Sequence, residues 1–328
     1  MSQDSPPSHP PSTEDISQII SKMLSEIEAA ARARNFKLAE ELHESLVVNY
    51  PMALREIIKA SGIIEDEKTA GIDQVHLALW GKLYDSLSDE ERNCLYYSMK
   101  RYVLRPKTMI LTHGQVNNRL FLIERGQITI FFKKDGKSYV LAQLGPGDIL
   151  GEYTFSTISL CSASAISHTE VQLMCLESKA ADGWEDRFPG LYEKLIDFCM
   201  KEGKVDEILR NKKLEKRTHH RFPASGRVKA ILLTKDGSKS DVVFGGGLSD
   251  ISVSGACFSM RCAKRSTARA LLARHLFLVI AGDQEQNPVT ISTRSRVVRV
   301  SFHLYGDFSV HVNFDKELAE ESVKRFAT

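Results

Sequence analysis

Residues 215–255 read EKRTHHRFPASGRVKAILLTKDGSKSDVVFGGGLSDISVSG, and this stretch decides how the last third of the chain is interpreted. It begins with two arginines four residues apart, Arg217 and Arg221, at the end of a charged helical pattern. It ends with Asp250, Ser252 and Gly255 at the spacing D-x-S-x-x-G, between apolar segments. Guanidinium groups pair with phosphate or with guanine O6 and N7, and a carboxylate accepts from the guanine N–H donors. The pattern therefore predicts a site for a ligand with phosphates and guanine edges.

Short apolar runs of period two follow this stretch and predict a small β-barrel closed by a helix. The predicted strands are residues 227–233, 242–244, 255–260, 276–280, 289–293, 296–302 and 310–314, and helices are predicted at 268–274 and 317–326. Gly245, Gly246 and Gly247 lack the Lys-Ser/Thr of a phosphate-binding loop, so we predict a flexible loop there. Strict alternation places Arg294 and Arg296 on one face of the sheet and Arg299 on the other.

The preceding residues predict a second β domain. Strand patterns fall at residues 102–104, 109–112, 119–124, 127–133, 139–144, 164–166 and 171–176, with glycine-containing turns between them. A helical pattern continues from 186 to 210, with Pro189 in its first turn. Many short strands at regular spacing favour a small barrel or sandwich.

The N-terminal region is predicted to be helical. Residues 1–13 are rich in Ser and Pro and predict disorder. Apolar residues at helical spacing then predict helices within 14–72, including a helical hairpin, and another helical stretch begins at Asp73. Hairpins of this kind serve in dimerisation modules, so self-association through these helices stays open.

Composition narrows the class of protein. The 328 residues are 42% hydrophobic and 26% charged, as in soluble proteins of two domains. No apolar run is long enough for a membrane span, and the N-terminus lacks a secretory pattern. Six cysteines without a C-x-x-C pair predict thiols in a reducing cytoplasm and no metal site. No nucleophile–base pattern or cofactor loop is present, so we expect no enzymatic activity and no cofactor.

Charge is divided unevenly along the chain. Residues 212–328 carry 20 Lys and Arg against 11 Asp and Glu, whereas residues 1–211 carry 24 against 31. The resulting charges of +9 and −7 favour an anionic ligand in the C-terminal part. No helix-turn-helix pattern accompanies this basic region, so DNA binding is not expected.

Residues 83–178 resemble the cyclic-nucleotide-binding β-roll of the cAMP receptor type, through LYDSLSDEE and RPKTMILTHGQVNNRLFLIERGQITIFFKKDGKSYVLAQLGPGDILGE. The resemblance implies that Glu152 bonds a ribose hydroxyl and that an arginine about ten residues later neutralises a cyclic phosphate. Cys161 stands near that position, followed by Ser162, and no Lys or Arg occurs between Lys137 and Lys179. A buried phosphate without a cation is costly, so we favour an interaction or signal-transmitting role. A second nucleotide site at Glu152 and Ser162 stays open.

Residues 215–328 resemble the PilZ family of cyclic di-GMP receptors, through R-x-x-x-R, D-x-S-x-x-G and the late segment SRVVRVSFHLYGDFSVHVNF. The resemblance implies that cyclic di-GMP is bound by Arg217, Arg221 and the D-x-S-x-x-G residues. Lys216 directly precedes the first arginine, and a basic residue there implies an intercalated ligand dimer. The alternatives are a solvated helix face for the arginines and a turn for Asp250 and Ser252.

These observations predict an α+β chain with N-terminal helices, a cyclic-nucleotide-binding-like β-roll with flanking helices, and a six-stranded antiparallel PilZ barrel with a terminal helix. The predicted boundaries are 14–72, 73–211 with the roll at 100–178, and 212–328. The expected function is that of a cytoplasmic bacterial cyclic di-GMP effector in which binding reorients the barrel relative to the roll. A dual receptor that also binds a cyclic mononucleotide, and a ligand-free interaction scaffold, are the alternatives.

Overall fold

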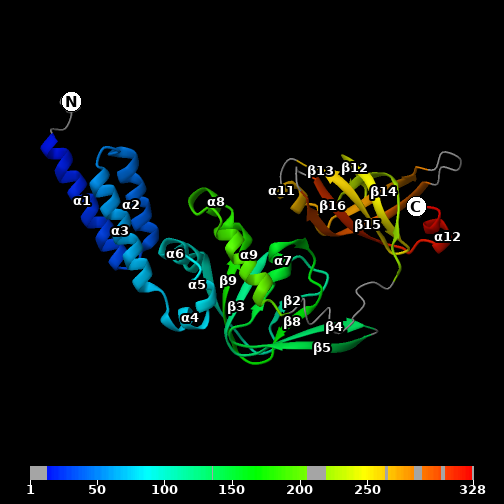
Figure 1. Ribbon diagram of the computed structural model, residues 1–328, viewed down its shortest axis with the longest axis horizontal. Coiled ribbons are helices and arrows are strands. Elements are labelled where there is room, and N and C mark those ends of the chain that lie inside the picture. Colours follow the sequence, from blue (N-terminus) through cyan, green and yellow to red (C-terminus); the bar gives the residue numbers. More distant parts are fainter. Residues whose placement is uncertain are drawn as a thin grey trace, which may run out of the picture. The chain divides into compact units, whose positions relative to one another are not determined.

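The structure is a computed structural model that describes residues 13–134, 136–204, 219–262, 265–283, 290–303 and 307–326. It divides into two compact units, residues 1–99 and residues 100–328 (Figure 1). The first unit is helical, and the second contains a β-roll and a β-barrel. Nearly all of the segment predicted to be disordered, residues 1–13, lies outside the described ranges.

Within residues 13–99, the described part of the first unit, the chain forms six helices. They are α1 (Thr13–Arg32), α2 (Phe36–Asn49), α3 (Leu54–Gly71), α4 (Gln74–Leu79), α5 (Gly81–Tyr84) and α6 (Asp89–Ser98). The apolar faces of the first three helices meet in one core, in which Ile27, Leu46 and Ala60 are fully buried. Burial of such faces, rather than intrinsic helix propensity, provides most of the stability of helices this short. Residues 73–98, grouped with the roll in the sequence analysis, contribute α4, α5 and α6 to this helical unit.

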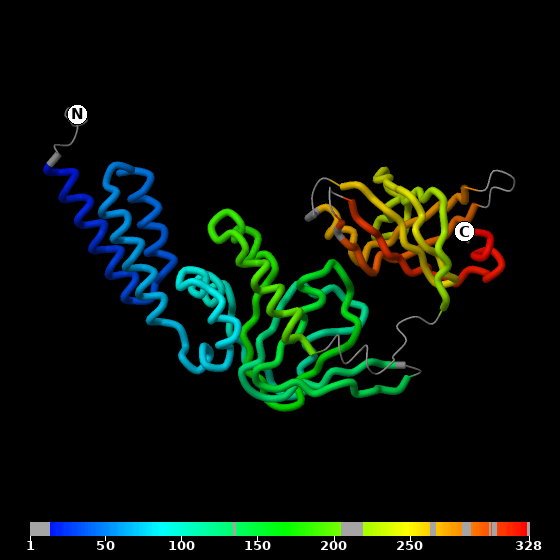
Figure 2. Tube along the Cα trace, viewed as in Figure 1, coloured from blue at the N-terminus to red at the C-terminus, as the bar shows by residue number. Residues whose placement is uncertain are grey.

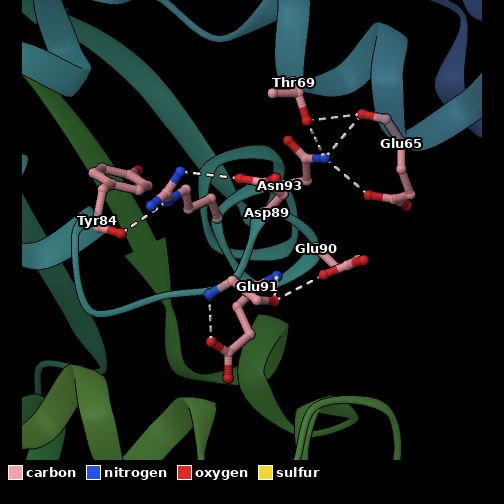
Figure 3. Close-up of polar contacts among 9 residues, drawn as sticks. Glu65, Thr69, Tyr84, Asp89, Glu90, Glu91 and Asn93 are labelled. Atoms are coloured by element: carbon pink, nitrogen blue, oxygen red, sulfur yellow. Dashed lines mark hydrogen bonds and ion pairs between the residues drawn. The ribbon is translucent and has the colours of Figure 1, made fainter. Parts of the chain in front are cut away.

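Side-chain hydrogen bonds fix α6 at its start and along its length (Figure 3). The hydroxyl of Ser88 accepts from the backbone N–H of Glu91, whose carboxylate accepts from the N–H of Ser88, so the two residues form a capping box. Further along, the amide of Asn93 donates to the carboxylate of Glu65 at 2.9 Å and to the hydroxyl of Thr69 at 3.0 Å. These bonds join α6 to α3.

The roll consists of two four-stranded sheets that enclose an apolar core. Their orders are β1-β9-β3-β6 and β2-β8-β4-β5. The strands are β1 (Met99–Leu104), β2 (Met109–Leu111), β3 (Arg119–Arg125), β4 (Ile128–Lys134), β5 (Lys137–Leu144), β6 (Ile149–Leu150), β8 (Ser164–Ser167) and β9 (Val171–Glu177). All seven strands expected from the sequence are present. Gly151 has φ +87°, and a Cβ there would lie 2.5 Å from the carbonyl oxygen of Arg119, so the turn after β6 requires glycine.

Short elements around the roll differ from the sequence prediction. Helix α7 (Glu152–Ser156) and strand β7 (Ile158–Ser159) follow β6 and were not predicted. The helical stretch expected at 186–210 is interrupted, because α8 (Trp184–Arg187) ends and α9 (Leu191–Glu202) begins after Gly190 at φ +84°. Pro189 therefore precedes the first turn instead of occupying it, and it disfavours helical backbone at the residue before it. Residues 205–210 of that prediction lie outside the described ranges.

The barrel is built from six antiparallel strands in the order β12-β11-β14-β15-β16-β13, closed because β12 also pairs with β13 (Figure 2). The two-residue strand β10 (Phe222–Pro223) pairs with the outer part of β12. The elements are β11 (Gly226–Leu233), β12 (Lys239–Ser252), β13 (Gly255–Arg261), α11 (Arg265–Arg269), β14 (His275–Gly282), β15 (Thr290–Phe302), β16 (Asp307–Phe314) and α12 (Glu320–Lys324). Alternate residues such as Val228, Phe258, Leu278 and Val310 point inward and are buried.

Two expectations about the barrel strands are wrong. Gly245, Gly246 and Gly247 lie inside β12 and do not form a loop. A Cβ on Gly245 would lie 2.0 Å from the Val228 carbonyl oxygen. Because glycine has no side chain, the backbones of β12 and β11 can approach each other closely here. The runs expected at 289–293 and 296–302 are one strand, β15. Apart from the strands, the helix expected at 268–274 is instead α11, which ends at Arg269, five residues earlier than expected.

A β-bulge in β15 overturns the predicted orientation of Arg299. The register against β16 shifts between Val297 and Arg299. Val297 and Val300 both point into the core, so the bulge accommodates one extra residue. Arg299 therefore lies on the outer face, which Arg294 and Arg296 share, and not opposite to them.

Candidate functional site

Arg221 and Asp250, one from each of the two predicted motifs, are in direct contact. The Nη1 atom of Arg221 donates to Oδ1 of Asp250 at 2.8 Å. Their side chains are 24% and 30% exposed, so solvent and ligands can reach both groups. Strand β10 creates this contact, because Pro223 lies opposite Asp250 in the β12 register. Lys216 and Arg217 lie outside the described residues.

Ser252 and Gly255 build the turn that presents Asp250. They face each other across the tight turn between β12 and β13. The Ser252 side chain is 2% exposed, and its hydroxyl donates to the carbonyl oxygen of Gly255 at 3.2 Å. A Cβ on Gly255 would lie 2.3 Å from the carbonyl oxygen of Val312, so only glycine fits without a backbone shift. The turn and the Asp250 carboxylate thus lie on the outer surface of the barrel.

Sequence reasoning missed two residues that extend this surface. Directly opposed residues on neighbouring strands form one row, Asp250 on β12, Cys257 on β13, His311 on β16 and Arg299 on β15. Opposed residues in an antiparallel sheet share a face. The alternation of Val310 and Val312 around His311 signals an outward imidazole, but nothing in the sequence places it beside Asp250.

The two middle residues of this row are shielded from solvent although they lie on the outer face of the barrel, and Cys257 is only 4% exposed. The Sγ atom of Cys257 lies 3.9 Å from Nε2 of His311. Burial lowers the pKa of His311 to about 4, and the charges of Arg299 and Arg221 add to this effect. The imidazole is therefore neutral at physiological pH and lies between two guanidinium groups. Burial also raises the pKa of Cys257 to about 11, so its thiol stays protonated.

A surface hollow adjoins the motif turn on its other side. It is lined by His219, His220, Phe222, Val253, Glu317, Leu318 and Glu320. The imidazole of His219 lies 3.7 Å from the carboxylate of Glu317. Two carboxylates in the lining disfavour a phosphate there, so the surface that carries Arg221 and Arg299 is the better anion site.

The roll also has a pocket, which contains the residues predicted as a second nucleotide site. Glu152, Cys161, Ser162 and Ser164 line it, together with apolar residues such as Leu150. Among the described residues of this lining, Glu152 is the one with a formal charge. It is 5% exposed and lies beside the end of α9, where a Cβ on Gly203 would be 3.2 Å from its Oε1. The pocket therefore offers hydroxyl and thiol groups but no cation.

Within the second unit, the segment after α7 contacts the barrel. Strand β7 pairs with β15, with Ser159 opposite Arg299, and the N–H of Leu160 donates to the carbonyl oxygen of Val298 at 3.1 Å. The guanidinium of Arg299 lies 5.8 Å from the ring centroid of Tyr153, at cation–π distance. Tyr153 belongs to α7 and lines the roll pocket. Arg299, a residue of the barrel, thus also contacts the roll.

No helix within the described ranges has the length and apolar character needed to cross a bilayer. The same residues contain no cluster of His, Cys, Asp and Glu that could hold a metal ion. All six cysteines lie in the described part of the chain, as thiols.

Comparison with known proteins identifies the roll. Residues 101–183 match the family described as the cyclic nucleotide-binding domain, and the match ends before the barrel. The chain therefore contains a cyclic nucleotide-binding domain, which suggests a role in nucleotide sensing and regulation. No curated protein sequence matches the chain.

Several solved structures are similar to part of this chain. A cyclic nucleotide-binding-like protein from Brucella abortus is 24% identical, with a TM-score of 0.30 over 32% of this chain and 91% of that one. A cyclic nucleotide-binding domain from Methylobacillus flagellatus is 23% identical, with a TM-score of 0.38 over 45% and 85%. The catabolite activator protein of Thermus thermophilus is 24% identical, with a TM-score of 0.33 over 40% of this chain and 60% of that one.

Proposed function

We propose that this chain is a cytoplasmic, non-enzymatic signalling protein of bacteria that binds cyclic di-GMP on a PilZ-type barrel without a cofactor. The observation that carries the proposal is the contact between Arg221 and Asp250. The end of the R-x-x-x-R segment meets the D-x-S-x-x-G turn on the outer face of a six-stranded barrel. The basic character of residues 212–328 supports an anionic ligand there.

The chemistry of this pair suits a guanine nucleotide. The Asp250 carboxylate can accept from guanine N1–H and N2–H₂, while Arg221 turns its planar fork to a phosphate or to the base. A partly exposed ion pair contributes about 1 kcal/mol or less, so ligand bonds can replace it at small cost. Lys216 and Arg217 are the further cations in this proposal, and they favour two stacked ligand molecules.

The roll then serves mainly to transmit the signal. Its pocket lacks a cation for a cyclic phosphate, and its β7 strand pairs with the barrel strand that carries Arg299. We propose that ligand binding changes this contact and so the orientation of barrel and roll. The ligand would shift an existing equilibrium through its different affinity for the two arrangements.

A thermal-shift screen tests the proposed ligand. A ligand that binds the folded state raises the unfolding temperature, and at a given concentration a tighter ligand raises it more. We expect stabilisation by cyclic di-GMP and little effect from cyclic di-AMP, because adenine lacks the donors that Asp250 recognises. The Asp250→Ala variant should lose the effect. Equal stabilisation by both dinucleotides would refute the guanine role of Asp250.

A second candidate function is supported by Glu152, which lies in the roll pocket as a ribose-binding carboxylate would. In this dual receptor the roll binds a cyclic mononucleotide as well. Stabilisation by cAMP or cGMP that disappears in Glu152→Ala would establish it. If neither cAMP nor cGMP stabilises the chain, the roll is an interaction module. A stable protein complex that is indifferent to nucleotides would lead to the same conclusion.

A further inference from the structure

We infer that Arg299 is a second anion-binding end of the barrel site, and that Cys257 and His311 form the floor between it and Arg221. This inference rests on the proposed function and extends it to residues outside both sequence motifs. The row from Asp250 to Arg299 crosses three strand spacings, or about 14 Å. A site of this breadth is suited to a ligand with two separate phosphates.

The β-bulge in β15 is the first observation that carries this assignment. Without the register shift between Val297 and Arg299, alternation would turn the arginine away from the outer face. With it, Arg299 stands directly opposite His311, on the face that Asp250 and Arg221 also share. The bulge therefore aims a guanidinium at the motif surface.

The partners of Arg299 are the second observation. Its guanidinium forms no ion pair with a carboxylate of the described residues and lies 5.8 Å from the ring centroid of Tyr153. By contrast, Arg261 on the same barrel is paired with Asp307 at 3.1 Å. An exposed arginine held over an aromatic ring keeps its hydrogen-bond donors available for phosphate.

The floor between the two arginines is the third observation. His311 and Cys257 lie side by side and carry no charge at neutral pH. The hydroxyl of Ser301 lies 3.4 Å from Nε2 of His311, on the Arg299 side of the row. A neutral floor adds neither attraction nor repulsion, so the two guanidinium groups define where anionic groups bind.

Calorimetric titration of the full chain with cyclic di-GMP tests this inference. We expect Arg299→Ala to weaken binding about ten- to a hundredfold, as loss of a charge-assisted contact does. Arg299→Lys should recover part of this loss, because it restores the charge without the fork. Arg294→Ala, on the same strand and face, is the matched control and should stay within about twofold of wild type.

Two further outcomes separate this inference from the function on which it rests. If Arg221→Ala abolishes binding while Arg299→Ala binds like wild type, the inference is overturned and the proposed function stands. If wild type releases no heat with cyclic di-GMP, both are overturned. Ring resonances of His311, assigned with His311→Gln, should shift on ligand addition, and unchanged resonances would remove His311 from the site.

Discussion

Arg221 and Asp250 are bonded through Nη1 and Oδ1 at 2.8 Å, although 29 positions separate them in the sequence. The contact joins the segment that enters the barrel to the turn between β12 and β13. Because both side chains remain partly exposed, the pair is accessible as well as ordered. The barrel therefore presents an acceptor and a cation side by side, ready to exchange partners with a ligand.

The energetic coupling of this pair can be measured. Arg221→Ala, Asp250→Ala and the double variant form a thermodynamic cycle, with stability read from hydrogen exchange of the β13 and β16 amides. We expect a coupling of about 1 kcal/mol, because the pair is partly desolvated. The exposed pair Arg261–Asp307, whose arginine is 91% exposed, is the control and should give about 0.3 kcal/mol. Equal couplings would show that the Arg221 pair is an ordinary surface contact.

The role of Gly255 in the motif turn is predicted to be structural. Its substitution by alanine places a Cβ 2.3 Å from the Val312 carbonyl oxygen, whereas a Cβ on Gly247 meets only the Ser259 hydroxyl at 3.6 Å. Gly255→Ala should therefore lower the barrel's free energy of unfolding by about 1–3 kcal/mol, and Gly247→Ala by clearly less. Hydrogen-exchange protection of barrel amides measures the free energy of unfolding of both variants. Similar losses of stability in the two variants would contradict the prediction.

The buried imidazole predicts how barrel stability depends on pH. The pKa of His311 falls from 6.5 to about 4, so the unfolded chain takes up a proton at higher pH than the folded chain. The stabilising effect is thus fully present above pH 6.5 and is lost as pH falls towards 4. We expect a loss on the order of 2 kcal/mol between these values. His311→Gln should abolish this part of the pH dependence, and an unaltered profile in that variant would exclude His311 as its source.

Thiol reactivity should separate the cysteines into two groups. Burial raises the pKa of four thiols, to about 11 for Cys161, Cys175 and Cys257 and to about 12 for Cys199. Only thiolates react, so these four should label about a hundredfold more slowly at neutral pH than the partly exposed Cys94 and Cys262. Labelling followed by peptide mass analysis checks this. Rapid labelling of Cys257 in the folded chain would contradict the burial of this thiol beside His311.

Much of the architecture could be predicted from local patterns. Period-two runs and glycine turns gave the strands of the roll, and residues 101–183 match the cyclic nucleotide-binding domain. In the barrel, the apolar alternation around Val310 and Val312 identified an inward face. Arg221 and Asp250 were expected to belong to one ligand site, and the structure places them in contact.

The missed features depend on contacts between distant strands. The three glycines of β12 look like a loop by composition, but Val228 and Ser259 on the neighbouring strands need that space. The β15 bulge is set by pairing with β16, and it reverses the face of Arg299. Cys257 and His311 join the site only through register, which a single sequence does not specify.

Titration calorimetry of wild type and Arg221→Ala with cyclic di-GMP tests the central proposal most directly, with Arg261→Ala as the control for loss of an Arg–Asp pair from the same barrel. We predict saturable binding by wild type and Arg261→Ala, with two ligands per chain. Arg221→Ala should bind at least about tenfold more weakly. Absence of binding by wild type, or equal affinity in Arg221→Ala, would contradict the assignment of the barrel as a cyclic di-GMP receptor.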